Sequence, residues 1–279
     1  MPTVNEIKNI YHVIAGAEAK KIEPLKAGFS NYSYLINQHY VLRLKKATED
    51  RFYDAQKEDR VIRAIAPLKI SESVAFFNEK DGTKLSLYLH RTQKMIGDPA
   101  PEQLSLVAKA LRKLHRAKIR MGFSFDLFER FKYYRSQCAD FVDTHYERKT
   151  IASVERFYNE EPFVLCHNDV VNGNLLFRKR KLFLIDFEYA ADNNPLFDLA
   201  SFLSENDIED ERVRRSFLKS YFNKRCDEKT YRRVQRFIAF QDILWYYWSQ
   251  MHYIRTKQQV YKRIAHHKWE AIIKNASSK

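Results

Sequence analysis

The chain has 279 residues, of which 45% are hydrophobic and 14% aromatic, so it can bury a core and is not disordered throughout. Lys and Arg number 49 against 35 Asp and Glu, and this net charge of +14 favours anionic partners such as nucleotides, nucleic acid or acidic lipid headgroups. The three cysteines fit neither a disulfide framework nor a metal knuckle, the N-terminus lacks a signal pattern, and no apolar run has the length of a membrane helix. We therefore expect a cytoplasmic protein with no membrane span.

The first third of the sequence predicts short strands joined by turns, and one helix. The expected strands span residues 22–29, 32–36, 39–44, 74–77 and 83–90. Asn37-Gln38 gives a two-residue turn between the second and third strands, and residues 78–82 give the turn between the last two. A charged stretch over residues 48–66, ended by Pro67, favours a helix. Together these elements predict a small antiparallel α+β lobe.

From Pro99 onwards the pattern is helical, with apolar residues at helical spacing over residues 104–114 and again over 128–141. Helices are expected to continue to the end of the chain, except at two short apolar runs that bracket a polar loop, 163–166 and 182–185. We predict an N-terminal lobe over residues 1–92 and a C-terminal lobe over residues 93–279.

The polar loop carries the strongest chemical signal in the chain. It contains His167, Asp169 and Asn174, and the pair Asp186-Phe187 begins 12 residues after Asn174. Phosphoryl transfer needs such a set, because one carboxylate orients the attacking hydroxyl while a second carboxylate and a carboxamide oxygen hold Mg²⁺. A single His-x-Asp or Asp-Phe pair is usually a turn or a cap. Several residue types at fixed offsets instead indicate the catalytic and metal loops of a kinase-like phosphotransferase.

These residues resemble the choline/ethanolamine kinase branch of the aminoglycoside-phosphotransferase-like fold, most closely the bacterial choline kinases. The resemblance rests on four segments, namely His167-Asn168-Asp169 with Asn174, Ile185-Asp186-Phe187-Glu188-Tyr189, Phe197-Asp198-Leu199-Ala200, and Glu205. The His-Arg-Asp and Asp-Phe-Gly signatures of protein kinases are absent, so a protein substrate is not expected. The resemblance implies a protein-kinase-like, two-lobed α+β fold, in which a small N-terminal antiparallel sheet lobe with one helix precedes a larger, mainly helical C-terminal lobe.

The resemblance also implies a role for each residue of the motif. Asp169 takes the position of the catalytic base that faces the substrate hydroxyl, and Asn174 and Asp186 bind Mg²⁺. Glu188 supports a second metal or the substrate. Two residues fix the same catalytic loop, His167 from within it and Asp198 from the following helix.

The first lobe resembles the family more loosely. Residues 28–31, Gly-Phe-Ser-Asn, stand where the family has its phosphate loop, and Ser30 and Asn31 with backbone amides would cover the phosphates of ATP. Arg43 matches the basic residue of a family strand that reaches the α- and β-phosphates. The acid expected to pair with this arginine is Glu58, with Glu49 and Asp54 as alternatives. Without the family, residues 28–31 would be a β-turn and Arg43 would form a surface ion pair.

The expected acceptor site lies on a long helical stretch that includes residues 241–248. Trp245 and Trp248 are three residues apart and share a helix face, and tryptophan faces suit a quaternary ammonium group. The resemblance agrees, because choline kinases carry a Trp-x-x-Trp helix at the choline site, and Glu205 aligns with a family acid near the ammonium. Neighbours that could complete the site are Asp242, His252 and one of Tyr221, Tyr253 and Tyr261. The alternative is that this aromatic stripe belongs to the core.

We therefore predict an ATP-dependent, Mg²⁺-requiring kinase of a small amine alcohol, with choline preferred. The alternatives with the same fold are an ethanolamine, thiamine or aminoglycoside kinase, and the alternative from another class is a non-catalytic basic binding module. The expected partners are ATP and a cationic alcohol, without a specific nucleic acid. Basic residues of the C-terminal tail are expected to form a solvated helical face, namely Lys257, Lys262, Arg263, Lys268 and Lys274.

Overall fold

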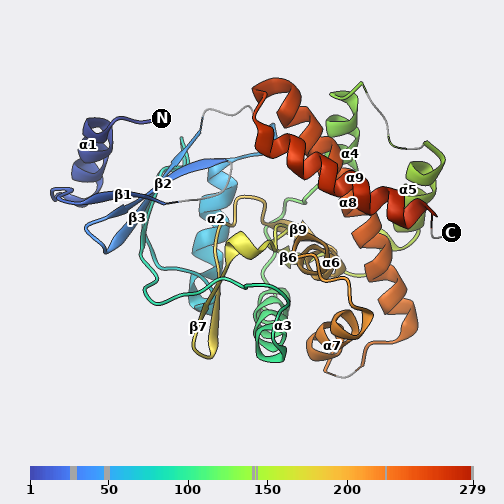
Figure 1. The fold of residues 1–279 in the computed structure, drawn as a ribbon. Helices are drawn as coiled ribbons and strands as arrows, with labels where there is room; N and C mark the ends of the chain where they lie inside the picture. The colour runs from blue at the N-terminus through green and yellow to red at the C-terminus, as the bar shows by residue number, and fades with distance from the viewer. Residues whose placement is uncertain (26–29, 47–50, 140–141, 143, 224, 278–279) are drawn as a thin grey trace. The chain divides into compact units, whose positions relative to one another are not determined.

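The computed structural model describes residues 1–25, 30–46, 51–139, 142, 144–223 and 225–277. These residues form two compact units, drawn in Figure 1. The first unit consists of Met1–Met121 with Asn172–Ala190, and the second consists of Gly122–Val171 with Ala191–Lys279. These units are defined by packing, and the functional lobes proposed for residues 1–92 and 93–279 stay a prediction.

The first unit contains an antiparallel five-stranded sheet with the strand order β1-β2-β3-β5-β4. Its strands are β1 Ile22–Leu25, β2 Asn31–Ile36, β3 Tyr40–Lys45, β4 Val74–Phe77 and β5 Lys84–Leu87. All five predicted strands are therefore present, although β5 is shorter than expected and residues 26–29 lie outside the described residues. Asn37 and Gln38 both have positive φ values, 52° and 58°, which is the backbone of a tight hairpin turn between β2 and β3.

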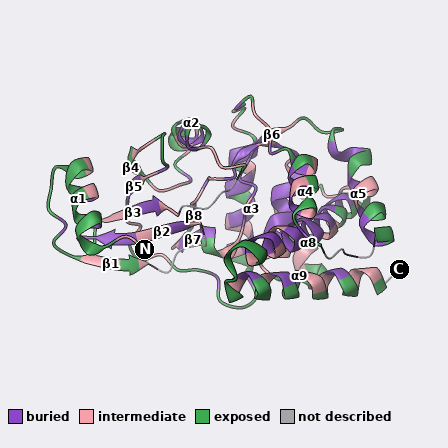
Figure 2. Ribbon diagram, turned by 90° about the horizontal axis from the view of Figure 1, so that it is seen from above, coloured by how far each residue is buried: buried purple, intermediate pink, exposed green. Residues whose placement is uncertain are grey.

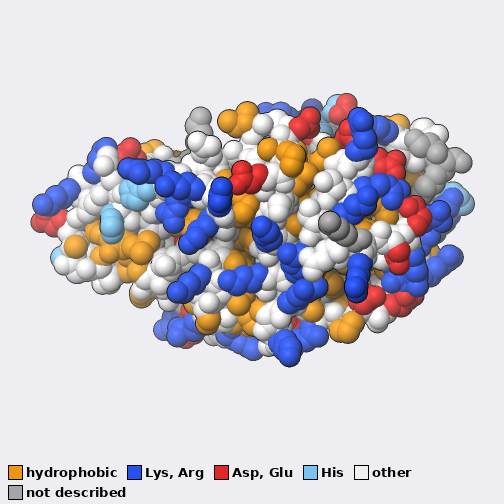
Figure 3. Space-filling model, turned by 90° about the horizontal axis from the view of Figure 1, so that it is seen from below, with side chains coloured by type: hydrophobic (Ala, Val, Ile, Leu, Met, Phe, Trp, Pro, Cys, Tyr) orange, Lys and Arg blue, Asp and Glu red, His pale blue; other side chains and the backbone are white. Residues whose placement is uncertain are grey.

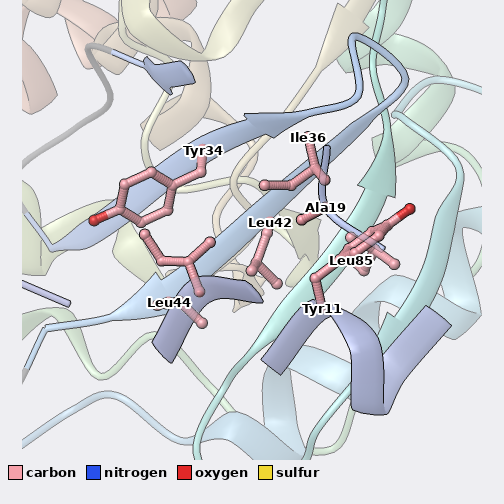
Figure 4. Close-up of a cluster of buried hydrophobic side chains, with 8 residues drawn as sticks. Tyr11, Ala19, Tyr34, Ile36, Leu42, Leu44 and Leu85 are labelled. Atoms are coloured by element: carbon pink, nitrogen blue, oxygen red, sulfur yellow. The ribbon is translucent and has the colours of Figure 1, made fainter. Parts of the chain in front are cut away.

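An N-terminal helix, α1 (Val4–Ala15), was not predicted. Thr3 and Glu6 form a capping box at its start, and Gly16 ends it in the left-handed conformation at φ 63°. Ile7 and Tyr11 are its buried residues. They pack against one face of the sheet in a hydrophobic cluster (Figure 4) that also contains Ala19, Tyr34, Ile36, Leu42, Leu44 and Leu85.

The helix expected over residues 48–66 is observed as α2 (Ala55–Ile65), so the predicted start was wrong. Asp54 begins this helix, because its side chain accepts hydrogen bonds from the backbone N–H groups of Gln56 and Lys57. The first unit also contains α3 (Pro101–His115), which contacts β8, and the hairpin of β7 (Leu175–Arg178) and β8 (Lys181–Leu184).

The second unit is mainly helical, as predicted for the later part of the chain. Its helices are α4 Leu127–Ser136, α5 Thr144–Tyr158, α6 Leu196–Glu205, α7 Glu211–Tyr221, α8 Glu228–Thr256 and α9 Gln259–Ser277. Helix α8 contacts α4, α5, α6 and α9, and Figure 2 shows it largely buried while α9 is buried along one side only. Two short strands pair antiparallel, β6 (Val164–Cys166) and β9 (Ala191–Asn193).

The surface is rich in positive charge. Lys and Arg side chains are spread over much of the face shown in Figure 3, with fewer acidic side chains among them. Among the described residues, no helix combines the length and the apolar character that a membrane crossing needs.

Candidate active site

The loop that contains Asp169 is held by helix α6 of the second unit. The fully buried carboxylate of Asp198 accepts hydrogen bonds from the backbone N–H groups of His167 at 2.8 Å and Asn168 at 2.7 Å. One turn further along α6, Ser201 Oγ accepts a hydrogen bond from the backbone N–H of Val170 at 3.0 Å. The predicted role of Asp198, steadying the loop from the following helix, is confirmed. A buried carboxylate that receives two backbone donors fixes the loop more firmly than neutral bonds would.

Within the loop, the backbone itself takes an unusual conformation. Asn168 is left-handed at φ 64°, and its side-chain Oδ1 accepts a hydrogen bond from Asn193 Nδ2 at 2.8 Å. His167 is buried, and its Nδ1 accepts a hydrogen bond from the backbone N–H of Asp169 at 3.3 Å. The imidazole of His167 thus contacts the loop backbone, and the loop presents Asp169 with its side chain partly exposed.

The first unit brings a second group of predicted residues together around Arg43. The Nη2 atom of Arg43 donates to Glu58 Oε1 at 2.5 Å, and its Nη1 atom donates to Asp186 Oδ1 at 2.7 Å. The side chains of Arg43 and Glu58 are buried, whereas that of Asp186 is 25% exposed. The predicted ion pair between Arg43 and Glu58 is confirmed. Of the two alternative acids, Asp54 caps α2 and Glu49 lies outside the described residues.

A second basic residue of β3, missed in the sequence, holds Glu188. Lys45 Nζ lies 2.6 Å from Glu188 Oε2, and Asn31 Nδ2 donates to the same oxygen at 3.3 Å. Burial opposes ionisation of Glu188, but Lys45, Arg43 and a hydrogen bond from Ser30 outweigh it and keep its pKa below the ordinary value. Alternation along a strand places Arg43 and Lys45 on one face, and this spacing was the signal available for Lys45.

The two acids of the Asp186-Phe187-Glu188 segment differ in charge behaviour. Loss of solvation and the negative charge of Glu188 raise the pKa of Asp186 to about 6, although Arg43 opposes the shift. Asp186 also has a left-handed backbone at φ 66°. The two neighbouring carboxylates repel one another, and a divalent cation bound by both would reduce this repulsion.

Asn174, the predicted third oxygen donor, lies in the same unit. It precedes β7, and its carbonyl oxygen accepts a hydrogen bond from the backbone N–H of Ile185 at 3.0 Å. In the register of the hairpin, Leu175 pairs with Leu184. Asn174, just before β7, and Asp186, just after β8, therefore lie at the same end of the hairpin. Two carboxylates and a carboxamide are hard oxygen donors, and this set fits Mg²⁺.

The predicted acceptor acid, Glu205, is bound by a lysine of the chain itself. Lys268 Nζ lies 2.6 Å from Glu205 Oε1 and 3.2 Å from Asp242 Oδ1, and it contacts Ser204 Oγ at 3.1 Å. The side chain of Lys268 is only 4% exposed. The expectation that Lys268 belongs to a solvated face was therefore wrong. Helix α9 packs on α8, and Lys268 lies on its packed side with the other buried residues Tyr261, Ala265 and Ile272.

Burial and mutual attraction act in opposite directions in this second ion cluster. Burial disfavours the charged ammonium of Lys268, but Glu205 and Asp242 outweigh it and raise the pKa of Lys268. Burial raises the pKa of Glu205, although Lys268 opposes this shift. The charge of Glu205 is thus already balanced within the second unit.

Aromatic side chains gather on the predicted face of α8. The rings of Trp245 and Trp248 lie 6.0 Å apart at 90°, and the ring of Tyr261 on α9 lies 5.6 Å from that of Trp248. His252 stacks on Tyr261 at 5.0 Å. Of the three tyrosines considered, Tyr261 therefore joins the tryptophan pair. The Nε1 atom of Trp248 is buried and has no hydrogen-bond partner among the described residues, so its N–H group is available to a ligand.

A kinase-like loop, a cluster of acids with basic partners and a five-stranded antiparallel sheet define a phosphotransferase of the protein-kinase-like fold. Residues 21–237 match the model of the phosphotransferase enzyme family, and the chain belongs to this family. Its class is that of a small-molecule kinase.

Comparison with individual proteins supports the same class. Protein LicA of Haemophilus influenzae is 27% identical over 244 residues, which cover 80% of this chain and 90% of LicA. The choline kinase LicA from Streptococcus pneumoniae has a TM-score of 0.82 at 19% identity over 98% of both chains. The GDP complex of an aminoglycoside 2'-phosphotransferase has a TM-score of 0.70 at 17% identity, over 99% of this chain and 100% of the other. The predicted kinase-like fold is confirmed.

Proposed function

We propose that the protein transfers the γ-phosphoryl group of ATP to the hydroxyl of a small amine alcohol, with choline preferred. The observation that carries the acceptor class is the aromatic cluster on α8, in which Trp245 and Trp248 stand at right angles with Tyr261 beside them. Ring faces in this arrangement attract a quaternary ammonium group. The similarity to LicA, a choline kinase in Streptococcus pneumoniae, supports the same acceptor.

Nucleotide binding is assigned to the first unit. Asn31 and Ser30 would donate to the phosphates, and Arg43 would contact them while Glu58 fixes the guanidinium. The similar aminoglycoside 2'-phosphotransferase binds GDP, which supports a nucleoside phosphate as donor. The thiols of all three cysteines are free, in keeping with a reducing cytoplasm where ATP is available.

Asn174, Asp186 and Glu188 would hold Mg²⁺, which when bound offsets the negative charge of the β- and γ-phosphates. Asp169 would accept the proton of the acceptor hydroxyl on a carboxylate oxygen. The hydrogen bonds from His167 and Asn168 to Asp198 would keep Asp169 in place during transfer. The chain's part in catalysis is therefore positioning and electrostatic stabilisation.

A coupled ADP-release assay tests this proposal. The purified chain with Mg²⁺ and ATP is offered choline, ethanolamine, thiamine and an aminoglycoside in parallel, and choline is expected to give the highest kcat/KM. Removal of Mg²⁺ with EDTA should stop turnover, and added Mg²⁺ should restore it. If ethanolamine, thiamine or the aminoglycoside is the best acceptor, the preferred substrate is wrong; if no acceptor raises ADP release, a non-catalytic basic module is favoured instead.

The Asp169→Asn variant is the matched test of chemistry. It removes the proton acceptor while keeping the size of the side chain, and we expect kcat to fall by about 10²–10⁴-fold. Asp192→Asn, at an acid of β9 outside the proposed machinery, serves as the control for folding and expression. Near-normal turnover of Asp169→Asn would contradict the assignment.

A further inference from the structure

The second unit contains a cavity that the proposed reaction does not use. Its volume is about 830 Å³, and its walls come mainly from α5, α8 and α9. A cavity of this size accepts a small organic molecule rather than a bare ion. We infer that this cavity binds a phosphomonoester and that the bound anion is coupled to Glu205 through Lys268.

Three cations without an ion pair among the described residues line one side of the cavity. Lys149 and Arg156 project from α5 at the i and i+7 positions, and Arg236 projects from α8. All three side chains are exposed, so they are free to reach a ligand. Two guanidinium groups with one ammonium are the donor set that proteins use for phosphate.

The acids of the cavity wall are not paired with these three cations, because each contacts a basic side chain of α9. Asp207 pairs with His267 and Glu209 pairs with Lys274. The remaining pairs of the α9 side are Glu270 with His266 and Asp242 with Lys268. The wall formed by α5 and α8 is therefore left with the excess positive charge.

Less exposed polar side chains also line the cavity. Arg214 donates to Gln235 Oε1 at 2.8 Å, which fixes the amide, and the buried Gln235 Nε2 has no hydrogen-bond partner in the part of the chain that the structure describes. Thr150, only 3% exposed, adds a hydroxyl to the wall. A buried donor without a partner costs free energy, and an anion in the cavity would satisfy it.

Lys268 joins this cavity to the proposed acceptor acid. Lys268 and Asp242 belong to the cavity wall, and Lys268 also bonds Glu205. A phosphomonoester in the cavity would compete for the ammonium of Lys268 and leave Glu205 with more of its negative charge. This step rests on the proposed function, because it requires that Glu205 face the ammonium of the acceptor. The anion would then tighten choline binding, and choline would tighten anion binding by the same factor.

Binding of the anion is tested without turnover. Glycerol 2-phosphate is titrated into the full chain by calorimetry at constant ionic strength, with NaCl replaced as the anion is added. We expect saturable binding that becomes at least about tenfold weaker in Arg156→Gln/Arg236→Gln. Arg148→Gln/Arg263→Gln removes the same charge from α5 and α9 outside the cavity and should bind as the unmodified chain does. Equal weakening in both variants, or full binding in the cavity variant, would overturn the site.

Coupling is tested by choline titration with and without glycerol 2-phosphate. We expect choline affinity to rise about fivefold with the anion in the unmodified chain, and not to respond in Arg156→Gln/Arg236→Gln or in Lys268→Met. The first of these variants changes only exposed side chains, so the test does not depend on whether Lys268→Met folds. A response that persists in the cavity variant would overturn the coupling. If choline binds under no condition, the proposed function fails, while the result of the anion titration still decides the cavity site.

Discussion

Two ion clusters in the described part of the chain carry the same charges but have different cations. In the first unit, Arg43 lies between Glu58 and Asp186. In the second, Lys268 lies between Glu205 and Asp242. Each cluster therefore places one positive charge against two carboxylates, and each takes an acid from a proposed ligand site. The two differ in how the cation distributes its hydrogen bonds.

The three donors of the Lys268 ammonium meet three acceptors, which are Glu205, Asp242 and Ser204. The guanidinium of Arg43 gives one nitrogen to each of its two acids, while its buried Nε has no hydrogen-bond partner among the described residues. All donors of the lysine ammonium are thus satisfied within its cluster, whereas the arginine has one N–H group without an acceptor among the described residues. A ligand can add to the arginine cluster, but a cation at Glu205 must compete with Lys268.

The largest contrast is expected when one acid of each cluster is neutralised. Asp186→Asn removes a proposed metal ligand, so kcat should fall about 1,000-fold or more. Asp242→Asn keeps the side-chain volume and leaves Glu205 to bind Lys268, so kcat should fall less than about tenfold. Both kcat values are to be measured in the coupled ADP-release assay with choline. Similar losses of kcat in the two variants would contradict the assignment of metal binding to the arginine cluster alone.

Removing the cation from each cluster is expected to give the next largest effect. Arg43→Met and Lys268→Met each leave two carboxylates, one of them almost fully buried, without their partner, so each should lower the free energy of unfolding by about 3–5 kcal/mol. Urea denaturation followed by circular dichroism measures this change. Arg212→Met removes a cation whose side chain is 93% exposed and which pairs with the half-exposed Asp210, and it should not change the denaturation midpoint measurably. A midpoint for Lys268→Met equal to that of the control would contradict burial of the lysine cluster.

The Arg43–Glu58 pair of the arginine cluster could be predicted because its signals are local, whereas Asp186 lies 143 residues from Arg43. The strand of Arg43 follows from alternation and from the Asn37-Gln38 turn, and Glu58 lies on the next helix along the chain. The loop of Asp169 was predicted from fixed spacing in one segment of sequence, and the supporting role of Asp198 was implied by the family resemblance. Where a motif lies close together in sequence, short-range rules largely determine its geometry.

The lysine cluster could not be predicted for the opposite reason. Lys268 lies 63 residues from Glu205. Its place among the apolar residues of α9 leads to burial only because that side of α9 packs on α8. A lysine at such a position ordinarily extends its charge to solvent. Helix α1 is a different case, because its start signal, the Thr3-x-x-Glu6 capping box, is local and present in the sequence.

Exchanging the two cations sharpens the comparison further. Arg43→Lys keeps the charge, but one ammonium cannot place two nitrogens in the fork that Glu58 and Asp186 occupy, so kcat/KM for ATP should fall about thirtyfold. Lys268→Arg has the adjoining cavity to accommodate the larger group, so KM for choline should change less than about threefold. Steady-state kinetics with ATP or choline varied separately distinguish these effects. An unchanged kcat/KM for ATP in Arg43→Lys would show that position 43 contributes only its charge and not the two-pronged geometry of the guanidinium.

The smallest expected effect concerns pH and the lysine cluster alone. Burial raises the pKa of Glu205 above its ordinary value near 4.5, so on acidification this carboxylate takes up a proton sooner than an exposed glutamate would. Because the neutral acid attracts no cation, choline binding should weaken by about threefold as pH falls from about 8 to about 5. The measurement is equilibrium binding without ATP or Mg²⁺, and comparison with Glu205→Gln separates Glu205 from Asp186, which also titrates in this range. Glu205→Gln should bind choline weakly and without this pH dependence, whereas an equal slope in the variant would show that a group other than Glu205 titrates.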